Sequence, residues 1–323
     1  MAEKLLSVED LNVTFSTRRG LVKAVNHLSF SLGKGETLGI VGESGSGKSV
    51  SMNAVMGLVR DSNVSISGSV KFNGIDLLTQ SDDQMRAIRG KEIAMVFQDP
   101  MTALTPVYTV GWHIIEQIRL HTTLSKDEAK KRAIEILDEV GIPDAKRRVD
   151  QYPHEFSGGM RQRAIIAMAL ALNPALLIAD EPTTALDVTI QAQILDLLKQ
   201  LQKTHNSSII IITHDMGVVS EIADEVLVMY AGRMVERKKK DALFAHPQHP
   251  YTQGLMNSVP RLDRPRTDRL EAIPGLPASL LALPQGCAFS TRCSRVHAAC
   301  VNEPPFVADE NGYGKACFLE DSR

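Results

Sequence analysis

Residues 42–49 limit the possible fold more than any other part of the chain, because they fit the pattern G-x-x-x-x-G-K-[ST]. Its glycines let the backbone fold around an anion with the N–H groups pointing inward. A helix expected from Lys48 towards Leu58 would present the positive end of its dipole to the same place. Lys48 would neutralise charge on terminal phosphates, and the Ser49 hydroxyl would ligate Mg²⁺. We therefore predict a nucleotide site at a phosphate loop made by Gly42, Glu43, Ser44, Gly45, Ser46, Gly47, Lys48 and Ser49.

The chain around this loop predicts an α/β fold. Three short apolar runs without alternation, each followed by a polar or glycine-rich turn, are typical of fully buried parallel strands; they lie at residues 38–41, 176–179 and 209–212. The middle of the chain is helical: Ser125 to Glu128 is a capping box, and Gly141 ends the helix that follows. Buried strands that alternate with helices indicate a central parallel sheet and a helical subdomain.

The first segment predicts a separate antiparallel β subdomain. Residues 11–15 and 28–32 are β-type runs, and the second of them alternates apolar and polar residues with a period of two. Residues 17–20, Thr-Arg-Arg-Gly, are typical of a turn between them.

Polar residues follow two of the buried runs. Asp180 and Glu181 come at the end of the 176–179 run, where Asp180 suits the outer shell of Mg²⁺ and Glu181 suits a general base that polarises the attacking water. A solvated strand end is the alternative for any Asp-Glu pair. His214 follows the 209–212 run, at the carboxyl end of a strand where open α/β sheets bind ligands. It would hydrogen-bond the γ-phosphate or the water, although a lone histidine is more often structural.

Composition excludes some classes of function. Lys and Arg total 36 and Asp and Glu total 38, and this balance argues against a dedicated nucleic-acid binder. No secretory signal is visible at the start of the chain. The longest apolar stretch, residues 164–179, is interrupted by Asn173 and Pro174 and is shorter than the about 20 residues that span a bilayer. If the chain works at a membrane, other chains must supply the spanning helices.

The composition changes near residue 260, where prolines become frequent and helical periodicity is lost. We predict a nucleotide-binding domain over residues 1–260 and an irregular cysteine-rich extension over 261–323. All four cysteines lie in this extension, with the spacing C-x₅-C-x₆-C-x₁₆-C. Such clustering in an intracellular chain favours a metal site over disulfides, and four thiolates hold Zn²⁺ or a [4Fe–4S] cluster. Ordinary thiols are the alternative reading of Cys287, Cys293, Cys300 and Cys317.

Taken in order, these segments resemble the ABC ATPase family over residues 5 to about 260. Phe156-Ser157-Gly158-Gly159-Met160 resembles the family's signature, usually L-S-G-G-Q, with Phe156 and Met160 as departures. The resemblance implies further roles. Gln98 would sense Mg²⁺ and water and touch the membrane subunits, and Phe15 would stack on adenine. Ala185-Leu186-Asp187 resembles the loop that crosses the dimer interface.

The resemblance also implies a mechanism and partners. Two such subunits would clamp ATP between the phosphate loop of one and Ser157, Gly158 and Gly159 of the other, and hydrolysis would release the dimer. The partners would be a second ATPase subunit (a paralogue, or a copy of this chain), two transmembrane permease subunits and, indirectly, an extracytoplasmic solute-binding protein. The expected location is peripheral, on the cytoplasmic face of the inner membrane.

The extension resembles that of the dipeptide and oligopeptide permease ATPases, a family that includes nickel importers. Residues 97–102, residues 249–253 and the surroundings of Cys287 and Cys293 carry this likeness. It favours [4Fe–4S] over zinc, although the family usually has Pro and His where this chain has Ser294 and Phe318. The sequence gives no physical reason for His249-Pro250-Tyr251, and a surface turn explains it equally well.

The leading hypothesis is thus the ATP-hydrolysing subunit of an importer for peptides or related solutes. Two alternatives stay open at this point. One is a redox- or iron-sensing ATPase whose extension is the active part. The other is a soluble ABC-type ATPase that takes no part in transport, although the long coiled coils or second ATPase domain usual in that class are missing from the sequence.

Overall fold

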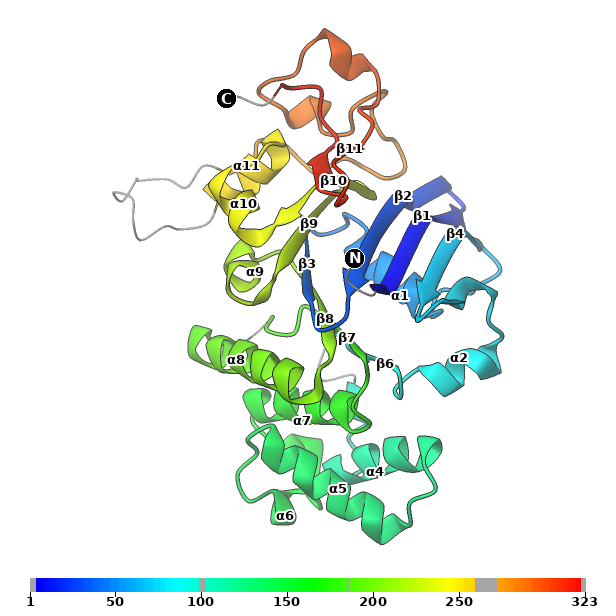
Figure 1. Cartoon of the computed structure of the whole chain (residues 1–323), viewed down its shortest axis with the longest axis vertical. Helices are drawn as coiled ribbons and strands as arrows, with labels where there is room; N and C mark the ends of the chain where they lie inside the picture. Colours follow the sequence, from blue (N-terminus) through cyan, green and yellow to red (C-terminus); the bar gives the residue numbers. More distant parts are fainter. Residues whose placement is uncertain (1–3, 99–102, 185, 259–271, 321–323) are drawn as a thin grey trace. The chain divides into compact units, whose positions relative to one another are not determined.

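A computed structural model describes residues 4–98, 103–184, 186–258 and 272–320 (Figure 1). The chain divides into two units: the first comprises Met1–Gly33, Thr37–Thr79 and Ile212–Arg323, and the second comprises Lys34–Glu36 and Gln80–Ile211. The predicted domain boundary after residue 260 lies outside the described residues and stays a prediction.

An antiparallel sheet forms part of the first unit. Strands β1 (Lys4–Thr17) and β2 (Gly20–Gly33) pair with each other, and β4 (Val64–Phe72) and β5 (Ile75–Asp76) extend the sheet in the order β2-β1-β4-β5. This confirms the predicted β subdomain and its turn at residues 17–20. Both long strands exceed the predicted runs because the pairing continues through register shifts, where Asp10 and His27 adopt positive φ.

A second set of strands in the first unit is mixed in direction. Strand β3 (Thr37–Val41) pairs in parallel with β9 (Glu225–Tyr230), while β10 (Arg233–Lys239) pairs with β9 in the antiparallel sense. The two-residue connection between β9 and β10 forces this reversal, since parallel neighbours need a long crossover. Strands β12 (Gly314–Lys315) and β11 (Val307–Ala308) of the extension add two further antiparallel pairings. The predicted central parallel sheet is therefore a mixed one.

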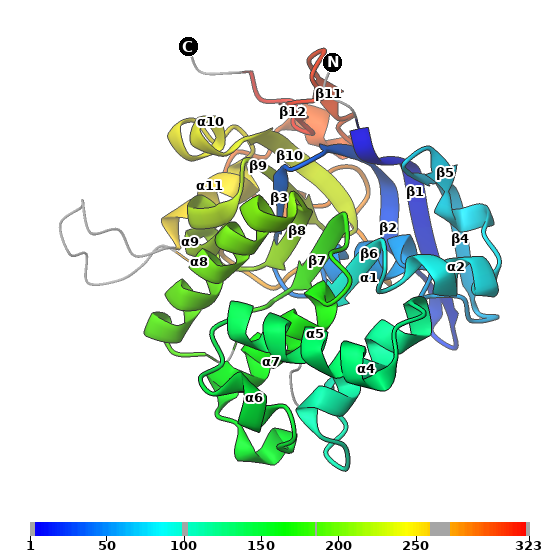
Figure 2. The ribbon, with the colours of Figure 1, turned by 60° about the horizontal axis from the view of Figure 1, so that its bottom comes forward.

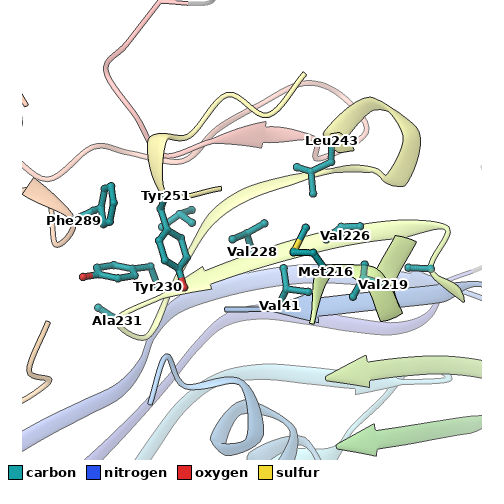
Figure 3. Close-up of a cluster of buried hydrophobic side chains, with 12 residues drawn as sticks. Val41, Met216, Val219, Val226, Val228, Tyr230, Ala231, Leu243, Tyr251 and Phe289 are labelled. Carbon is teal, nitrogen blue, oxygen red and sulfur yellow. The ribbon is translucent and has the colours of Figure 1, made fainter. Parts of the chain in front are cut away.

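Helices pack against these strands around one apolar cluster, which Figure 3 shows. Val41, Val226 and Val228 come from the strands, while Tyr251 and Phe289 come from α11 and the extension. Burying a large apolar side chain stabilises a fold by about 1.5–3 kcal/mol. The helices of this unit are α1 (Lys48–Val55), α9 (Met216–Ile222), α10 (Lys240–Ala245) and α11 (Pro250–Asn257).

The second unit contains parallel strands and most of the helical chain (Figure 2). Strands β6 (Ile93–Val96) and β7 (Leu176–Asp180) pair in parallel. The predicted capping box is present, with Ser125 and Glu128 bonded reciprocally at the start of α5. The helices of this unit are α2 (Asp82–Ile88), α4 (Val110–His121), α5 (Lys126–Glu139), α6 (Ala145–Arg148), α7 (Gly158–Leu170) and α8 (Val188–His205).

Strand β8 (Ser208–Thr213) carries the chain from the second unit into the first. The three apolar runs predicted as buried strands thus correspond to β3, β7 and β8, and every residue of all three is buried. The α/β class with an antiparallel β subdomain and a helical subdomain is confirmed.

The extension is irregular, as predicted. Besides β11 and β12, its described part has two short 3₁₀ turns at Ser290–Arg292 and Ala298–Val301. Among the described residues of the chain, no helix combines the length and the apolar character needed to cross a membrane. The longest apolar stretch of the sequence forms part of α7 and then β7.

Candidate functional site: the phosphate loop and the signature segment

The phosphate loop joins β3 to α1, which is the context that the sequence predicted. Gly42 has φ 155° and Gly47 has φ 99°. A Cβ atom at Gly42 would lie 2.2 Å from the Met229 carbonyl oxygen, and one at Gly47 would lie 2.3 Å from that of Ala24. Only glycine fits at these two positions, because both the backbone conformation and the space exclude a side chain.

Lys48 is the first residue of α1 and is only 5% exposed. Its Nζ atom donates to the carbonyl oxygens of Gly42, at 2.6 Å, and Glu43, at 2.9 Å. The ammonium group therefore lies inside the curve of its own loop, where it would meet an anion. Ser49, next on the helix, is half-buried.

Two other predicted residues of the first unit lie on strands or at their ends. Phe15 is partly buried on β1, paired with Val22 of β2 and Val64 of β4. His214 follows β8 directly and is exposed, just before the residue that caps α9.

The structure adds two residues that sequence reasoning did not assign to the site. Arg292 of the extension donates from Nη1 and Nη2 to both carboxylate oxygens of Glu43, at 2.6 and 2.9 Å. The backbone N–H of Glu43 donates to the Tyr251 hydroxyl at 2.7 Å. These partners lie 249 and 208 positions away along the chain, so no local pattern could have revealed them.

Electrostatics agree with this arrangement. The hydrogen bond to Glu43 raises the pKa of Arg292 above its usual range, so the guanidinium stays charged. Burial raises the pKa of the Tyr251 phenol, so its hydroxyl stays neutral. His249, two residues before, caps α11 by accepting from the Tyr251 N–H at 3.1 Å. The motif His249-Pro250-Tyr251 is thus a helix start that aims Tyr251 at the phosphate loop, not a surface turn.

In the second unit, the structure brings Gln98 and Glu181 together. Gln98 Nε2 donates to Glu181 Oε2 at 3.1 Å, and Thr184 Oγ1 donates to the same oxygen at 2.8 Å. Glu181 has φ 47°, which is uncommon for a residue with a side chain. Asp180, the last residue of β7, is buried.

The signature segment starts α7. Ser157 is the N-cap, and its Oγ atom accepts from the Met160 N–H at 3.3 Å. Ser157 and Gly158 are exposed, so this helix start is open to a ligand. Asp187 caps α8 in the same way by accepting from the Ile190 N–H at 3.0 Å. A Cβ atom at Gly159 would lie 3.0 Å from Ile190, so the starts of α7 and α8 lie side by side.

The departure at Phe156 has a packing explanation. Its ring is 3% exposed, and the Arg148 guanidinium lies 6.0 Å from its centroid. Ala185 and the segment 99–102, which also carried the resemblance, lie outside the described residues.

The four cysteines gather in the extension. Burial raises the pKa of the Cys287 and Cys293 thiols, and the other cysteines add to each shift by repulsion. Both side chains also pack against the apolar cluster of Figure 3. Within the described parts of the chain, no group of three or more His, Cys, Asp or Glu side chains is arranged to hold a metal ion. The [4Fe–4S] or zinc site expected from the sequence therefore stays a prediction.

Comparison with known proteins places this geometry in context. The ABC transporter family matches residues 25–184, and the family described as "Oligopeptide/dipeptide transporter, C-terminal region" matches residues 235–300. The oligopeptide transport ATP-binding protein OppD of Salmonella typhimurium is 53% identical over 98% of this chain and 94% of its own length. The dipeptide transport ATP-binding protein DppD of Bacillus subtilis is 50% identical over 99% of this chain and 96% of its own.

A solved structure also resembles this chain. The dimeric post-hydrolysis state of an ATP-binding cassette bound to ADP and Pi is 29% identical, with a TM-score of 0.64, over 73% of this chain and 98% of that one. With the phosphate loop, the acidic strand end and the capped signature helix in family order, the chain belongs to the ATP-binding proteins of ABC transporters and is an ATPase of that family.

Proposed function

We propose that the chain is the ATP-hydrolysing subunit of an importer for oligopeptides or dipeptides. The observation that carries this proposal is the near-complete match to transport ATP-binding proteins named for these solutes, together with the family match at residues 235–300, which reaches into the extension. The redox-sensing and non-transport alternatives have no such support.

Within this function, the first unit binds the nucleotide. The N–H groups of residues 42–49 and the start of α1 hold the phosphates, Lys48 neutralises the terminal ones, and Phe15 stacks on adenine. Ser49 and Gln98 would supply oxygen donors for Mg²⁺ and the Asp180 carboxylate would assist in holding the ion, because oxygen is the type of ligand that Mg²⁺ prefers. Magnesium would neutralise phosphate charge during hydrolysis.

Glu181 acts as the general base that takes a proton from the attacking water. Its hydrogen bonds from Gln98 and Thr184 support this role by fixing the carboxylate. His214, at the end of β8, hydrogen-bonds the γ-phosphate or the water.

A second ATPase subunit, either a paralogue or a copy of this chain, completes the site. The start of α7 at Ser157, Gly158 and Gly159, where the first two residues are exposed, would meet the nucleotide held by the partner, and Asp187 would lie at the same interface. The dimeric cassette with ADP and Pi supports this arrangement. ATP favours closure because it contacts both subunits only in the closed dimer.

The proposed location is peripheral, on the cytoplasmic face of the inner membrane. Two transmembrane permease subunits would supply the path for the solute, and an extracytoplasmic binding protein would deliver it. We also propose that residues 1–260 form the ATPase domain and that residues 261–323 form the extension.

Co-purification from native membranes, with each bound subunit identified by mass, followed by reconstitution into liposomes, tests the transport function. We expect peptide uptake that depends on ATP and ceases with Glu181→Gln. A complex that hydrolyses ATP but moves amino acids or metal ions instead of peptides would reject the proposed solute.

The metal cluster of the extension is a separate proposal. Its support is the spacing of four cysteines and their mutual electrostatic influence, whereas the described arrangement would have to change for the thiols to share one metal. Anaerobically purified protein with iron and sulfide near about four each per chain would support [4Fe–4S]. Stoichiometric zinc would point to the alternative, and four titratable thiols without either metal would leave packing as their role.

A further inference from the structure

The phosphate loop is held from outside by the extension, at a single residue. Glu43 receives two parallel hydrogen bonds from Arg292, and the side chains are 26% and 3% exposed respectively. A bidentate pair between a guanidinium and a carboxylate fixes orientation as well as distance. The carboxylate of Glu43 is therefore turned towards the extension.

The backbone of the same residue is held by a second contact. The N–H group of Glu43 donates to the hydroxyl of Tyr251, which is fully buried. The Tyr251 ring packs against Tyr230 and Phe289, with centroids 4.7 and 5.4 Å apart (Figure 3). The acceptor for this N–H is thus fixed by the apolar cluster.

Arg292 is held as firmly as Tyr251. Its Nε atom donates to the Pro274 carbonyl oxygen at 2.8 Å, and its guanidinium lies 5.9 Å from the ring centroids of both Tyr230 and Phe289. These contacts oppose movement of the Arg292 side chain away from Glu43. Through Arg292, the position of the extension therefore influences the position of Glu43 in the loop.

Glu43 is also where the loop holds its own lysine. Its carbonyl oxygen accepts from Lys48 Nζ at 2.9 Å and from the Ser46 N–H at 3.2 Å. Fixing Glu43 therefore fixes the curvature of the loop and the position of the lysine. The extension also lines the other side of this loop, because a cavity of about 300 Å³ lies between residues 43–46 and residues 277–281.

We propose that Arg292 and Tyr251 are positioning residues for the nucleotide: they hold Glu43 so that the phosphate loop is already in its binding conformation before ATP arrives. This inference rests on the proposed binding of MgATP by residues 42–49. The extension is then part of the nucleotide site. Preorganisation of this kind acts on affinity, because the ordering of the loop no longer opposes binding.

The experiment measures the Kd for MgATP, and KM and kcat for hydrolysis, in the full-length chain with Arg292→Met, Arg292→Lys, Glu43→Gln and Tyr251→Phe. For Arg292→Met we expect Kd and KM to rise about tenfold or more with kcat changed much less, since a charge-assisted pair is lost. Arg292→Lys keeps the charge but loses the bidentate geometry of the guanidinium. Its Kd and KM should therefore lie between those of Arg292→Met and those of the wild type. The double variant Arg292→Met with Glu43→Gln should bind MgATP no more weakly than the weaker-binding single variant, because the two substitutions remove the same interaction.

Arg237→Met is the matched control. Arg237 is a buried arginine that pairs with Glu225 at 2.7 Å and lies 5.8 Å from the ring centroid of Tyr313 in the extension, without touching the loop. We expect it to lower the melting temperature and to leave the Kd for MgATP as in the wild type. A comparable rise in Kd for Arg237→Met would show that general loosening explains the effect and would overturn the proposal.

Two results separate this inference from the proposed function. If Lys48→Ala binds MgATP like the wild type, the loop is not the nucleotide site and the proposed function fails. If Lys48→Ala loses binding while Arg292→Met and Glu43→Gln keep wild-type Kd and KM, the function stands and the positioning role is refuted. Should Arg292→Met fail to fold, Arg292→Lys and Glu43→Gln decide by the same criterion.

Discussion

At the scale of single residues, Glu181 combines three unusual properties. It has a backbone conformation that few residues with side chains adopt, it directly follows a buried strand, and one of its oxygens accepts two side-chain hydrogen bonds. Such conformations cost on the order of 1–3 kcal/mol and persist where the surrounding contacts determine them. The proposed base is thus held by its neighbours in a fixed direction.

Glu181→Gln should keep MgATP binding and lower the rate of hydrolysis by about 10²–10⁴-fold, because an amide cannot accept the proton of water. Phosphate release and nucleotide retention are the measurements. Glu135→Gln is the control, since this exposed carboxylate pairs with Arg132 on α5 at 3.6 Å. Hydrolysis near the wild-type rate in Glu181→Gln would mean that another group is the base.

The glycines of the loop give a second prediction at this scale. Gly45→Ala places a methyl group in open space and bears only the cost of a left-handed backbone, about 1–2 kcal/mol. Gly47→Ala has the same kind of backbone cost and adds a contact with a backbone carbonyl that cannot move cheaply. Urea unfolding should show a clearly larger loss of stability for Gly47→Ala. Equal losses would contradict the described packing of the loop against β2.

At the scale of elements, the start of α11 is built from buried polar groups. Glu236 of β10 is fully buried, and its carboxylate accepts from the backbone N–H groups of Gln248 and His249, at 2.7 and 2.8 Å. His249 is 2% exposed and caps the helix with a neutral ring nitrogen. Burial lowers the pKa of His249 to about 4, and the nearby charges of Lys315 and Arg295 add to the shift.

This shift predicts a pH dependence of stability. The ordinary pKa of histidine is 6.5, so between pH 6.5 and about 4 the unfolded chain binds a proton that the folded chain does not. The free energy of unfolding should fall over this window by about 3 kcal/mol from His249, with its contribution complete above pH 6.5. Denaturant unfolding at several pH values measures this change in the wild type and in His249→Asn, because the asparagine side chain also caps a helix.

His249→Asn should lose less stability than the wild type as the pH falls, because asparagine does not titrate. All other groups are common to both proteins. Identical pH profiles for the two would show that His249 does not titrate in this window.

At the scale of the whole chain, the extension shares a buried apolar core with the rest of the first unit. Phe289 is 4% exposed and belongs to the same buried cluster as Val41 of β3 and Tyr251 of α11. Ala316 donates its N–H to the Val235 carbonyl oxygen at 2.8 Å, which continues the pairing of β12 with β10. The extension therefore contributes to the stability of this unit as well as to its surface.

Phe289→Ala should lower the free energy of unfolding by about 3–5 kcal/mol, as expected for a large side chain removed from a well-packed core. Equilibrium unfolding in urea is the measurement. Val301→Ala, at a position 67% exposed in the same extension, should change it by less than about 0.5 kcal/mol. A small effect of Phe289→Ala would mean that the extension docks loosely.

The elements whose signals are local could be predicted from the sequence. The loop at 42–49, the strands at 38–41, 176–179 and 209–212, and the capping box at Ser125 follow from patterns within a few residues. The family resemblance predicted a role for Gln98, whose side chain donates a hydrogen bond to Glu181 in the structure. The direction of β10 was missed because a two-residue turn outweighs the expectation of a parallel sheet.

The contacts of the extension follow from tertiary packing and could not be predicted from local sequence patterns. The contacts of Arg292 and Tyr251 with Glu43 join residues more than two hundred positions apart, and nothing in their own neighbourhoods specifies the partner. Likewise, cysteine spacing suggested metal ligands, but the position of each thiol depends on how Phe289 and its neighbours pack. Periodicity and motifs are set by nearest neighbours along the chain, whereas these contacts exist only after the apolar cluster has brought distant segments together.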